Sequence, residues 1–383
     1  MLAAFVLMAS PAEAAQLTLT WADGSGGSAS FYIERKTGST GTFARIAQQG
    51  PGDVSYVDGT VAPGALYCYR VQAFTSAGTS GYSNEACANS PTPARRLADL
   101  SGDGRSDILW RHSSGAVYVW LMSGATVVAT GSPGSAAPDW GIQDVGDLSG
   151  DGRADIVWRH SSGALHAWLM NGIGVGTEAS LDLLTDDWTI QAVGDFSGDG
   201  RTDILLRQAS GTVGIRFMNG ATITAFGSPG SALSEWNIAG AGDLNGDGRT
   251  DIVWRHSSGA VYAWLMNGAV VTSSPGLAHV SADWRIESVS DFNGDGRADI
   301  LWRHTSGLVY IWFMNGGTIG STASLGTVPA DWKIEAIGDL NGDRRADILW
   351  RHVSGAVSAW FMNGGTVTLN SSLGWVDPAW AID

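Results

Sequence analysis

The sequence predicts an all-β protein, with a β-sandwich followed by a closed six-bladed β-propeller of 48-residue repeats. Three observations support this fold class. Glycine and tryptophan are abundant, with 53 and 18 residues, and this combination is typical of tight turns around an aromatic, β-rich interior. Short runs of alternating apolar and polar residues fill positions 16–88, as in half-buried strands. One acidic motif then recurs six times at constant spacing, which indicates a repeat architecture.

Composition narrows the range of functions. The 383 residues carry a formal net charge of −15, although only 15% of them are charged. Nucleic acid is excluded as a partner because phosphate binding requires clustered Lys and Arg. The acids recur singly at fixed positions, a pattern that favours ligand binding over a solvated acidic tail. No segment after the first residues is apolar for long enough to cross a membrane.

Residues 1–15 predict a secretory signal peptide. An apolar run from Leu2 to Ala9 precedes Ala12-Glu13-Ala14, a small-x-small cleavage pattern. The run is too short to span a bilayer. We therefore expect a protein secreted by a bacterial type of export, extracellular or on the cell surface. The alternative is an ordinary buried N-terminal segment.

Residues 16–88 predict a β-sandwich of about seven short strands. Strand-like segments lie at 17–21, 31–36, 42–47, 67–74 and near 82–88. Trp21 should face the core, and Tyr67, Tyr69 and Val71 should alternate onto one face. The segment resembles a fibronectin type III domain, through Trp21 in the second strand and VAPGALYCYRVQAFTSAGTSGYSN at 61–84. In that resemblance Tyr67 takes the place of the family's tyrosine corner.

The two cysteines predict a cross-strand disulfide. Cys68 and Cys87 lie symmetrically about Ala77-Gly78, the centre of the SAGTSG connection. They should therefore face each other across a hairpin at a separation that suits a bridge. An even pair of cysteines in an exported protein also favours a disulfide. The stretch ANSPTPA at 88–94 contains two prolines, so we assign residues 89–96 to a semi-rigid linker.

Residues 97–383 form the repeat array. The first acid of each copy falls at Asp99, Asp147, Asp195, Asp243, Asp291 and Asp339. In the fourth copy, strand-like segments at 236–242, 251–255, 259–266 and 269–273 give the four strands of a propeller blade. Their long apolar runs suit strands that are buried on both faces.

The two ends of the array predict that it closes. Each repeat contains a Trp-x-Ile segment, which is missing before the first copy, whereas the chain ends on Trp380-Ala381-Ile382-Asp383. The C-terminal segment would supply the missing beginning of the first blade's inner strand. Closure within one strand abolishes an unpaired sheet edge, so we expect a ring of six blades.

The repeated loop carries the donors of a calcium site. In the fourth copy Asp243, Asn245 and Asp247 alternate, Gly248 permits a left-handed turn, and Asp251 follows. Side-chain oxygens at positions one, three, five and nine, with the carbonyl at seven, match the six to eight oxygens that Ca²⁺ prefers. Close sets of His or Cys, as in zinc sites, are absent. The alternative is an empty Asx-type turn, although clustered carboxylates without a cation repel one another.

The motif resembles the FG-GAP repeat, also called the VCBS repeat, of integrin α-chain propellers and bacterial surface proteins. The pattern Asp-x-Asn/Ser-Gly-Asp-Gly-x-x-Asp-Ile is intact five times, and the resemblance covers residues 97–383. It implies up to six bound Ca²⁺. In the sixth loop Arg344 replaces a glycine, which predicts strain and a weakened site. The implied ligands are Asp99, Ser101, Asp103, Asp107, Asp147, Ser149, Asp151, Asp155, Asp195, Ser197, Asp199, Asp203, Asp243, Asn245, Asp247, Asp251, Asp291, Asn293, Asp295, Asp299, Asp339, Asn341, Asp343 and Asp347.

A second recurring motif, Trp-Arg-His, follows each loop except the third. Its tryptophans either pack between blades or stack on glycans, as in the propeller lectins that the family resembles. Its other residues either anchor loops by hydrogen bonds or contact a ligand. These candidate ligand-binding residues are Arg111, His112, Arg159, His160, Arg255, His256, Arg303, His304, Arg351 and His352. The third copy has Leu206, Gln208 and Arg216 instead of Trp, His and Trp, so we expect no more than five equivalent pockets.

Catalysis is disfavoured because an active site needs one asymmetric constellation, and no Ser-His-Asp set or lone activated cysteine stands out. The sequence thus predicts a monomeric, calcium-stabilised, non-catalytic protein for extracellular recognition or adhesion, which binds a glycan or a protein. Display of several sites on one ring would raise avidity. The alternative is a polysaccharide lyase or hydrolase, or the substrate-targeting module of such an enzyme.

Overall fold

The computed structural model describes residues 5–8, 17–58, 61, 66–89 and 94–382. The expected cleavage pattern at 12–14, the centre of the linker and Asp383 lie outside these residues. The chain divides into two compact units: Met1–Pro93 with Ala282–Arg285, and Ala94–Ser281 with Ile286–Asp383. No helix in the described part of the chain is long and apolar enough to cross a membrane.

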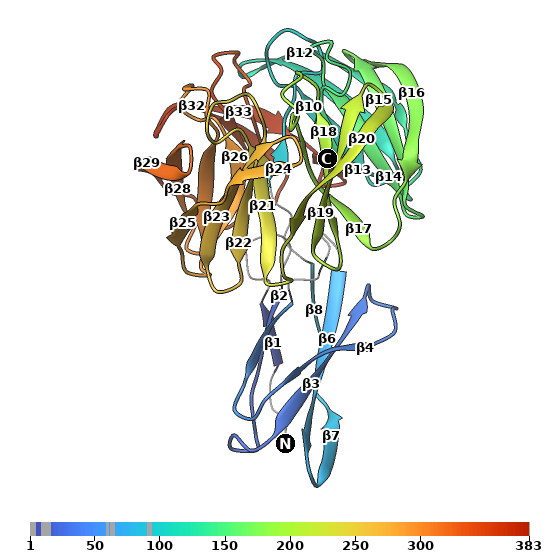
Figure 1. Ribbon diagram of the computed structural model, residues 1–383, viewed down its shortest axis with the longest axis vertical. Helices are drawn as coiled ribbons and strands as arrows, with labels where there is room; N and C mark the ends of the chain where they lie inside the picture. Colours follow the sequence, from blue (N-terminus) through green and yellow to red (C-terminus); the bar gives the residue numbers. More distant parts are fainter. Residues whose placement is uncertain (1–4, 9–16, 59–60, 62–65, 90–93, 383) are drawn as a thin grey trace. The chain divides into compact units, whose positions relative to one another are not determined.

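The described residues of the N-terminal unit form two antiparallel sheets (Figure 1). One has the order β1-β2-β5, and the other has the order β4-β3-β6-β7, with β8 also paired to β6. The strands are β1 (Phe5–Met8), β2 (Leu17–Trp21), β3 (Ser30–Thr37), β4 (Ala44–Gln49), β5 (Ser55–Asp58), β6 (Leu66–Thr75), β7 (Gly78–Tyr82) and β8 (Ala86–Asn89). Part of the segment expected to be a signal peptide forms β1, which pairs with β2.

Apolar residues from both sheets form the core of this unit. Trp21, Tyr67, Tyr69 and Val71 are all buried, as the alternating pattern predicted. The sequence did not indicate β5, because this strand is short and mostly exposed. Its last residue, Asp58, is nevertheless fully buried.

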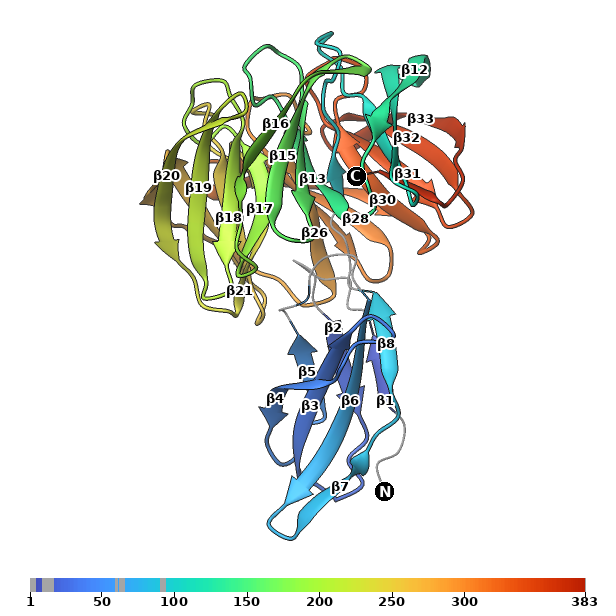
Figure 2. The ribbon, with the colours of Figure 1, turned by 90° about the vertical axis from the view of Figure 1, so that its right-hand side faces the viewer.

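The second unit is built from six sheets of repeated strands within the described residues. Figure 2 shows one of them, with β17 (Trp188–Gly194), β18 (Asp203–Gln208), β19 (Thr212–Asn219) and β20 (Thr222–Ser231) side by side. The other first strands are β13 (Trp140–Gly146), β21 (Trp236–Gly242), β26 (Trp284–Ser290) and β30 (Trp332–Gly338). The other second strands are β10 (Ile108–His112), β14 (Asp155–His160), β22 (Asp251–His256), β27 (Asp299–His304) and β31 (Asp347–His352).

The outer half of each sheet completes this all-β, propeller-like repeat. The remaining third strands are β11 (Ala116–Ser123), β15 (Ala164–Asn171), β23 (Ala260–Asn267), β28 (Leu308–Asn315) and β32 (Ala356–Asn363). The remaining fourth strands are β12 (Thr126–Ser135), β16 (Gly174–Leu183), β29 (Thr318–Thr327) and β33 (Thr366–Trp375), with β24 (Val270–Ser273) and β25 (Gly276–His279) in the fourth sheet. The second strands are buried along nearly their whole length, as their apolar runs predicted.

The fourth strands are longer than the sequence indicated. Five of them have ten residues, whereas the segment recognised in the fourth copy was 269–273. That copy is the exception, since its outer strand is interrupted at Ser274 and Pro275. The pattern of the fourth copy therefore predicts an outer strand that is too short for the other repeats.

The C-terminal strand β34 (Trp380–Ile382) pairs with β10 of the first sheet. Its register, with Trp380 opposite His112 and Ile382 opposite Trp110, repeats that of β13 on β14. The pairing is the one that the missing Trp-x-Ile segment predicted. Residues assigned to the linker also form structure: β9 (Arg95–Arg96) pairs in parallel with β30 of the last sheet.

Candidate functional site

From the second repeat onward, each acidic loop connects the first strand to the second, for example β21 to β22, whereas the first loop lies between β9 and β10. Two glycines curl the fourth loop, Gly246 with φ 78° and Gly248 with φ 81°. In the sixth loop Arg344 occupies the second glycine position with φ 65°, the only positive φ of a non-glycine residue in the described part of the chain. This conformation costs a residue with a Cβ about 1–2 kcal/mol, so the strain predicted there is present.

The first acid of each loop binds the backbone of its own loop. Asp243 Oδ1 accepts hydrogen bonds from the amides of Asn245, Gly246 and Asp247 at 2.7–3.3 Å, and its Oδ2 accepts one from Gly248 at 2.8 Å. Asp99 and Asp339 have the same pattern. Both oxygens of this carboxylate therefore already have partners.

The ninth-position acid is buried and fastens the loop to its sheet. Asp251 Oδ2 accepts from the amide of Leu244 at 3.0 Å, and Oδ1 accepts from Met266 at 2.7 Å. Burial raises the pKa of this carboxyl to about 7, against the lowering effect of these hydrogen bonds. Burial likewise raises the pKa to about 6 in Asp107, Asp155 and Asp203 and to about 7 in Asp299 and Asp347.

The remaining donors are also engaged. Asn245 Oδ1 accepts from the amide of Asp247, and its Nδ2 donates to Asp247 Oδ2 at 3.1 Å. In the third loop Asp199 accepts from the backbone and the guanidinium of Arg201. Among the described residues, no loop brings three carboxylate oxygens within 4.8 Å of one another. The donors have the chemistry of a calcium site, but in this structure the oxygens of the first and ninth acids already accept hydrogen bonds from the protein.

The loops also define the protein's relationships. A family model described as FG-GAP-like repeat matches residues 99–158, 147–206, 195–254 and 291–350, more than half of the chain. The chain belongs to the FG-GAP-like repeat family. FG-GAP repeats are typical of protein-interaction and adhesion modules. No curated protein matches the chain.

Several solved structures are similar to this FG-GAP-like chain. Raptor from Chaetomium thermophilum has 12% sequence identity and a TM-score of 0.42, over 75% of this chain and 24% of that chain. The FG-GAP-like chain therefore spans about a quarter of Raptor. BBS1N, in complex with ARL6DN, has 12% identity and a TM-score of 0.41, over 79% of this chain and 88% of that chain. The FN1-FN3 domains of chicken CNTN1 have 16% identity and a TM-score of 0.21, over 47% of this chain and 66% of that chain.

The arginines of the Trp-Arg-His motif lie between FG-GAP-like sheets, and four of the five expected as ligand contacts are buried. Arg255 is 0% exposed and donates to the carbonyls of Val280 and Ser281 at 3.0 and 3.1 Å. Its guanidinium lies 5.2 Å from the ring centre of Trp302 in the next repeat. Burial lowers the pKa of Arg255 to about 10, so it stays charged at neutral pH. The same stacking joins Arg111 to Trp158, Arg207 to Trp254, Arg303 to Trp350 and Arg351 to Trp110.

The histidines of the motif anchor the following turn. His160 Nδ1 lies 2.6 Å from Ser162 Oγ and accepts from the amide of Ser162 at 3.1 Å. Its Nε2 lies 2.7 Å from Asp139 Oδ2, and this hydrogen bond lowers the pKa of Asp139. The turn contact recurs at His112, His256, His304 and His352, and Asp331 pairs with His352. The sequence did not indicate this Asp-His-Ser chain, because Asp139 lies 21 residues before His160 and the pairing of β13 with β14 brings them together.

An aromatic pocket of about 350 Å³ opens beside the interrupted outer strand of the fourth sheet. Trp236, Tyr262 and Trp264 line it above Trp254, which is 2% exposed. Tyr262 is 39% exposed, and Ser231, Leu233 and Ser274 complete the wall without a charged side chain. Trp236 belongs to the Trp-x-Ile segment and Trp254 to the Trp-Arg-His motif, but the opening itself follows from the broken strand.

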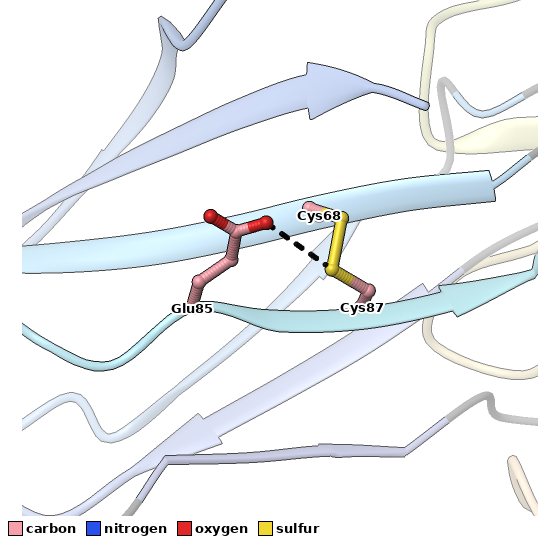
Figure 3. Close-up of side chains that lie close together, drawn as sticks. All are labelled: Cys68, Glu85 and Cys87. Carbon is pink, nitrogen blue, oxygen red and sulfur yellow. Dashed lines mark hydrogen bonds between the residues drawn. A yellow bond between two sulfur atoms is a disulfide. The ribbon is translucent and has the colours of Figure 1, made fainter. Parts of the chain in front are cut away.

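The predicted disulfide is present in the N-terminal unit. Cys68 and Cys87 are bonded and lie opposite each other on β6 and β8. Figure 3 shows Glu85 beside the bridge, with its Oε1 3.4 Å from Cys87 Sγ. Lys36 Nζ lies 2.7 Å from the same carboxylate. The two cysteines therefore have a structural role, because both sulfur atoms form the disulfide.

Proposed function

We propose that this protein is a non-catalytic recognition protein that binds a glycan at the aromatic pocket of its fourth repeat. The observation that carries the proposal is the pocket itself, in which the exposed Tyr262 and the half-buried Trp236 and Trp264 meet serine hydroxyls and no charged side chain. Such a surface suits a neutral ring that has both an apolar face and hydroxyls. Secretion and a fibronectin type III-like sandwich, both expected from the sequence, belong to this proposal, and the disulfide is compatible with export.

A closed six-bladed ring would present this pocket on a rigid scaffold. One hydrogen bond supports closure, because it joins every repeat to the next. The amide at position eight of a loop donates to the carbonyl of the preceding loop's first acid, as from Ala154 to Asp99 at 2.7 Å. The series continues from Ser106 to Asp339 at 2.6 Å, between the first and last repeats. Together with the β34–β10 pairing, this series of hydrogen bonds supports closure of the array.

Glycan binding can be tested with a glycan array followed by calorimetry on the best ligand. Tyr262→Ala should weaken binding about tenfold, because an exposed aromatic contact contributes roughly 1–2 kcal/mol. Tyr310→Ala is the matched control, since Tyr310 occupies the same position beside a continuous outer strand in the fifth repeat. The proposal fails if the array gives no ligand, or if both variants bind like the wild type.

The enzyme alternative has one specific observation in its favour, the hydrogen-bonded chain Asp139–His160–Ser162. Its serine lies in a turn that recurs in five repeats, which favours an anchoring role over nucleophilic attack. Polysaccharide turnover by the wild type that disappears in Ser162→Ala would establish the enzyme instead.

A further inference from the structure

The loops contain a second recurring residue that the calcium motif does not explain. Position seven is an arginine in all six copies: Arg105, Arg153, Arg201, Arg249, Arg297 and Arg345. The motif requires only a backbone carbonyl at that position. The side chain is therefore free to do something else.

Three of these arginines donate hydrogen bonds to two successive loops. Arg201 Nη1 donates to Asp199 Oδ2 of its own loop at 3.2 Å, and its Nε donates to the carbonyl of Ser149 in the preceding loop at 3.3 Å. Arg153 reaches Ser101, and Arg345 reaches Asn293, in the same way. A planar guanidinium suits this bridge because it presents several donors in fixed directions.

The packing of the arginines extends around all six repeats. A Cβ placed on Gly150 would lie only 3.2 Å from Arg201 Cγ, so the arginine stem covers the preceding loop's first glycine. The same contact joins Gly102 to Arg153, Gly198 to Arg249, Gly246 to Arg297 and Gly294 to Arg345. It also joins Gly342 of the last loop to Arg105 of the first, with 3.2 Å between the placed Cβ and Arg105 Cγ.

The acids of the loops thus have partners within the protein. Backbone amides satisfy the first and ninth acids, and the arginine faces the fifth. We propose that the position-seven arginines are the cations that link successive acidic loops, so that the array is stable without calcium. The contribution of each exposed pair is modest, but the hydrogen-bonded bridge occurs at three junctions and the packing of arginine on glycine occurs at all six. The proposal is independent of whether the aromatic pocket binds a glycan.

Melting of the full chain in EDTA and in millimolar calcium chloride tests the first half of the proposal. The melting temperature should be the same in both, and calorimetric titration with calcium chloride should give no binding heat. Calcium bound at several loops would raise the melting temperature by roughly 10 °C. A rise of that size, or a stoichiometric binding isotherm, would overturn the proposal.

Substitution of single arginines tests the second half. Arg201→Gln removes both contacts and should lower the melting temperature by about 3 °C. Arg201→Lys keeps the charge without the two-directional donors, so it should recover only part of the loss. Arg249→Gln is the matched control, because Arg249 covers Gly198 while its buried Nε has no hydrogen-bond partner. The bridge is rejected if Arg201→Gln melts like the wild type or no lower than Arg249→Gln.

Discussion

The two units of this protein are both all-β, but they are stabilised in different ways. The sandwich depends on contacts that occur once: the Cys68–Cys87 disulfide and the buried Asp58, which receives hydrogen bonds from Arg35 and Tyr69 at 2.8 Å. The array repeats one set of contacts through its six copies. Loss of a contact that occurs once removes all stabilisation of that kind, whereas loss of one repeated contact leaves the equivalent contacts in the other repeats. The third repeat illustrates this, since it keeps its strands although Leu206 replaces the motif tryptophan.

The pairing between the two ends of the array should make the largest single contribution to its stability. Deletion of residues 380–383 removes the pairing of β34 with β10 and exposes Trp110, which is now buried. The free energy of unfolding should fall by about 3–5 kcal/mol, measured by calorimetry. Ala381→Ser, at an exposed position of β34, is the control and should be neutral. A truncated chain as stable as the full one would contradict closure.

The disulfide should have the next largest effect, confined to the sandwich. Replacement of Cys68 and Cys87 by Ala releases a link between residues 19 positions apart. The expected loss is about 3 kcal/mol, chiefly because the unfolded chain gains freedom. Calorimetry should show a lower transition for the sandwich and an unchanged one for the array. A shift in both transitions would mean that the two units do not unfold separately.

Unequal repeats provide a sharper comparison within the array. Arg255→Gln leaves the part-buried carbonyls of Val280 and Ser281 without this donor and removes the stacking on Trp302, which should cost about 2–3 kcal/mol. Arg159 faces the third repeat, where Leu206 replaces the tryptophan, and its hydrogen bond to Thr185 is 3.5 Å long. Arg159→Gln should therefore cost less than 1 kcal/mol, about the value of one weak hydrogen bond. Equal losses in urea unfolding would show that the stacking contributes nothing.

The buried ninth-position acids predict how the array responds to pH. Their pKa values are raised to about 6 or 7, so the folded protein binds protons more tightly than the unfolded chain, whose Asp pKa is about 4. Their contribution to stability is therefore present at low pH and is lost as pH rises through about 7. The array transition in EDTA should fall by a few degrees from about pH 5 to about pH 8. A transition that does not change over this range would show that the acids are already ionised at about pH 5 in the folded protein.

The smallest expected change is a gain. Arg344→Gly restores the glycine found at this position in the other five loops and removes a strained positive φ, which should add about 1 kcal/mol. The reverse change, Gly248→Arg, should cost a similar amount in the fourth loop. If Arg344→Gly instead lowers the melting temperature, the arginine side chain stabilises the fold by more than its backbone conformation costs.

Local pattern was enough to predict much of this molecule. The repeat spacing, the all-β class and the turn glycines follow from short-range chemistry, because strands and turns depend on neighbouring residues. The pairing of Trp380–Ile382 with the first sheet could be predicted for a related reason, since the repeat identified which strand was missing. The Cys68–Cys87 bridge could also be predicted, because both residues belong to adjoining strands.

The roles of the charged side chains were decided by the tertiary structure. The acidic loop has a sequence that suits calcium, but backbone amides and Arg201 compete for the same oxygens, and sequence spacing does not reveal which partner they meet. Arg255 lies near the end of a strand, where the sequence suggests exposure, yet the neighbouring sheet buries it against Trp302. The aromatic pocket depends on a break in one outer strand. Sequence determined which groups are present in each repeat, while packing between repeats determined what each group contacts.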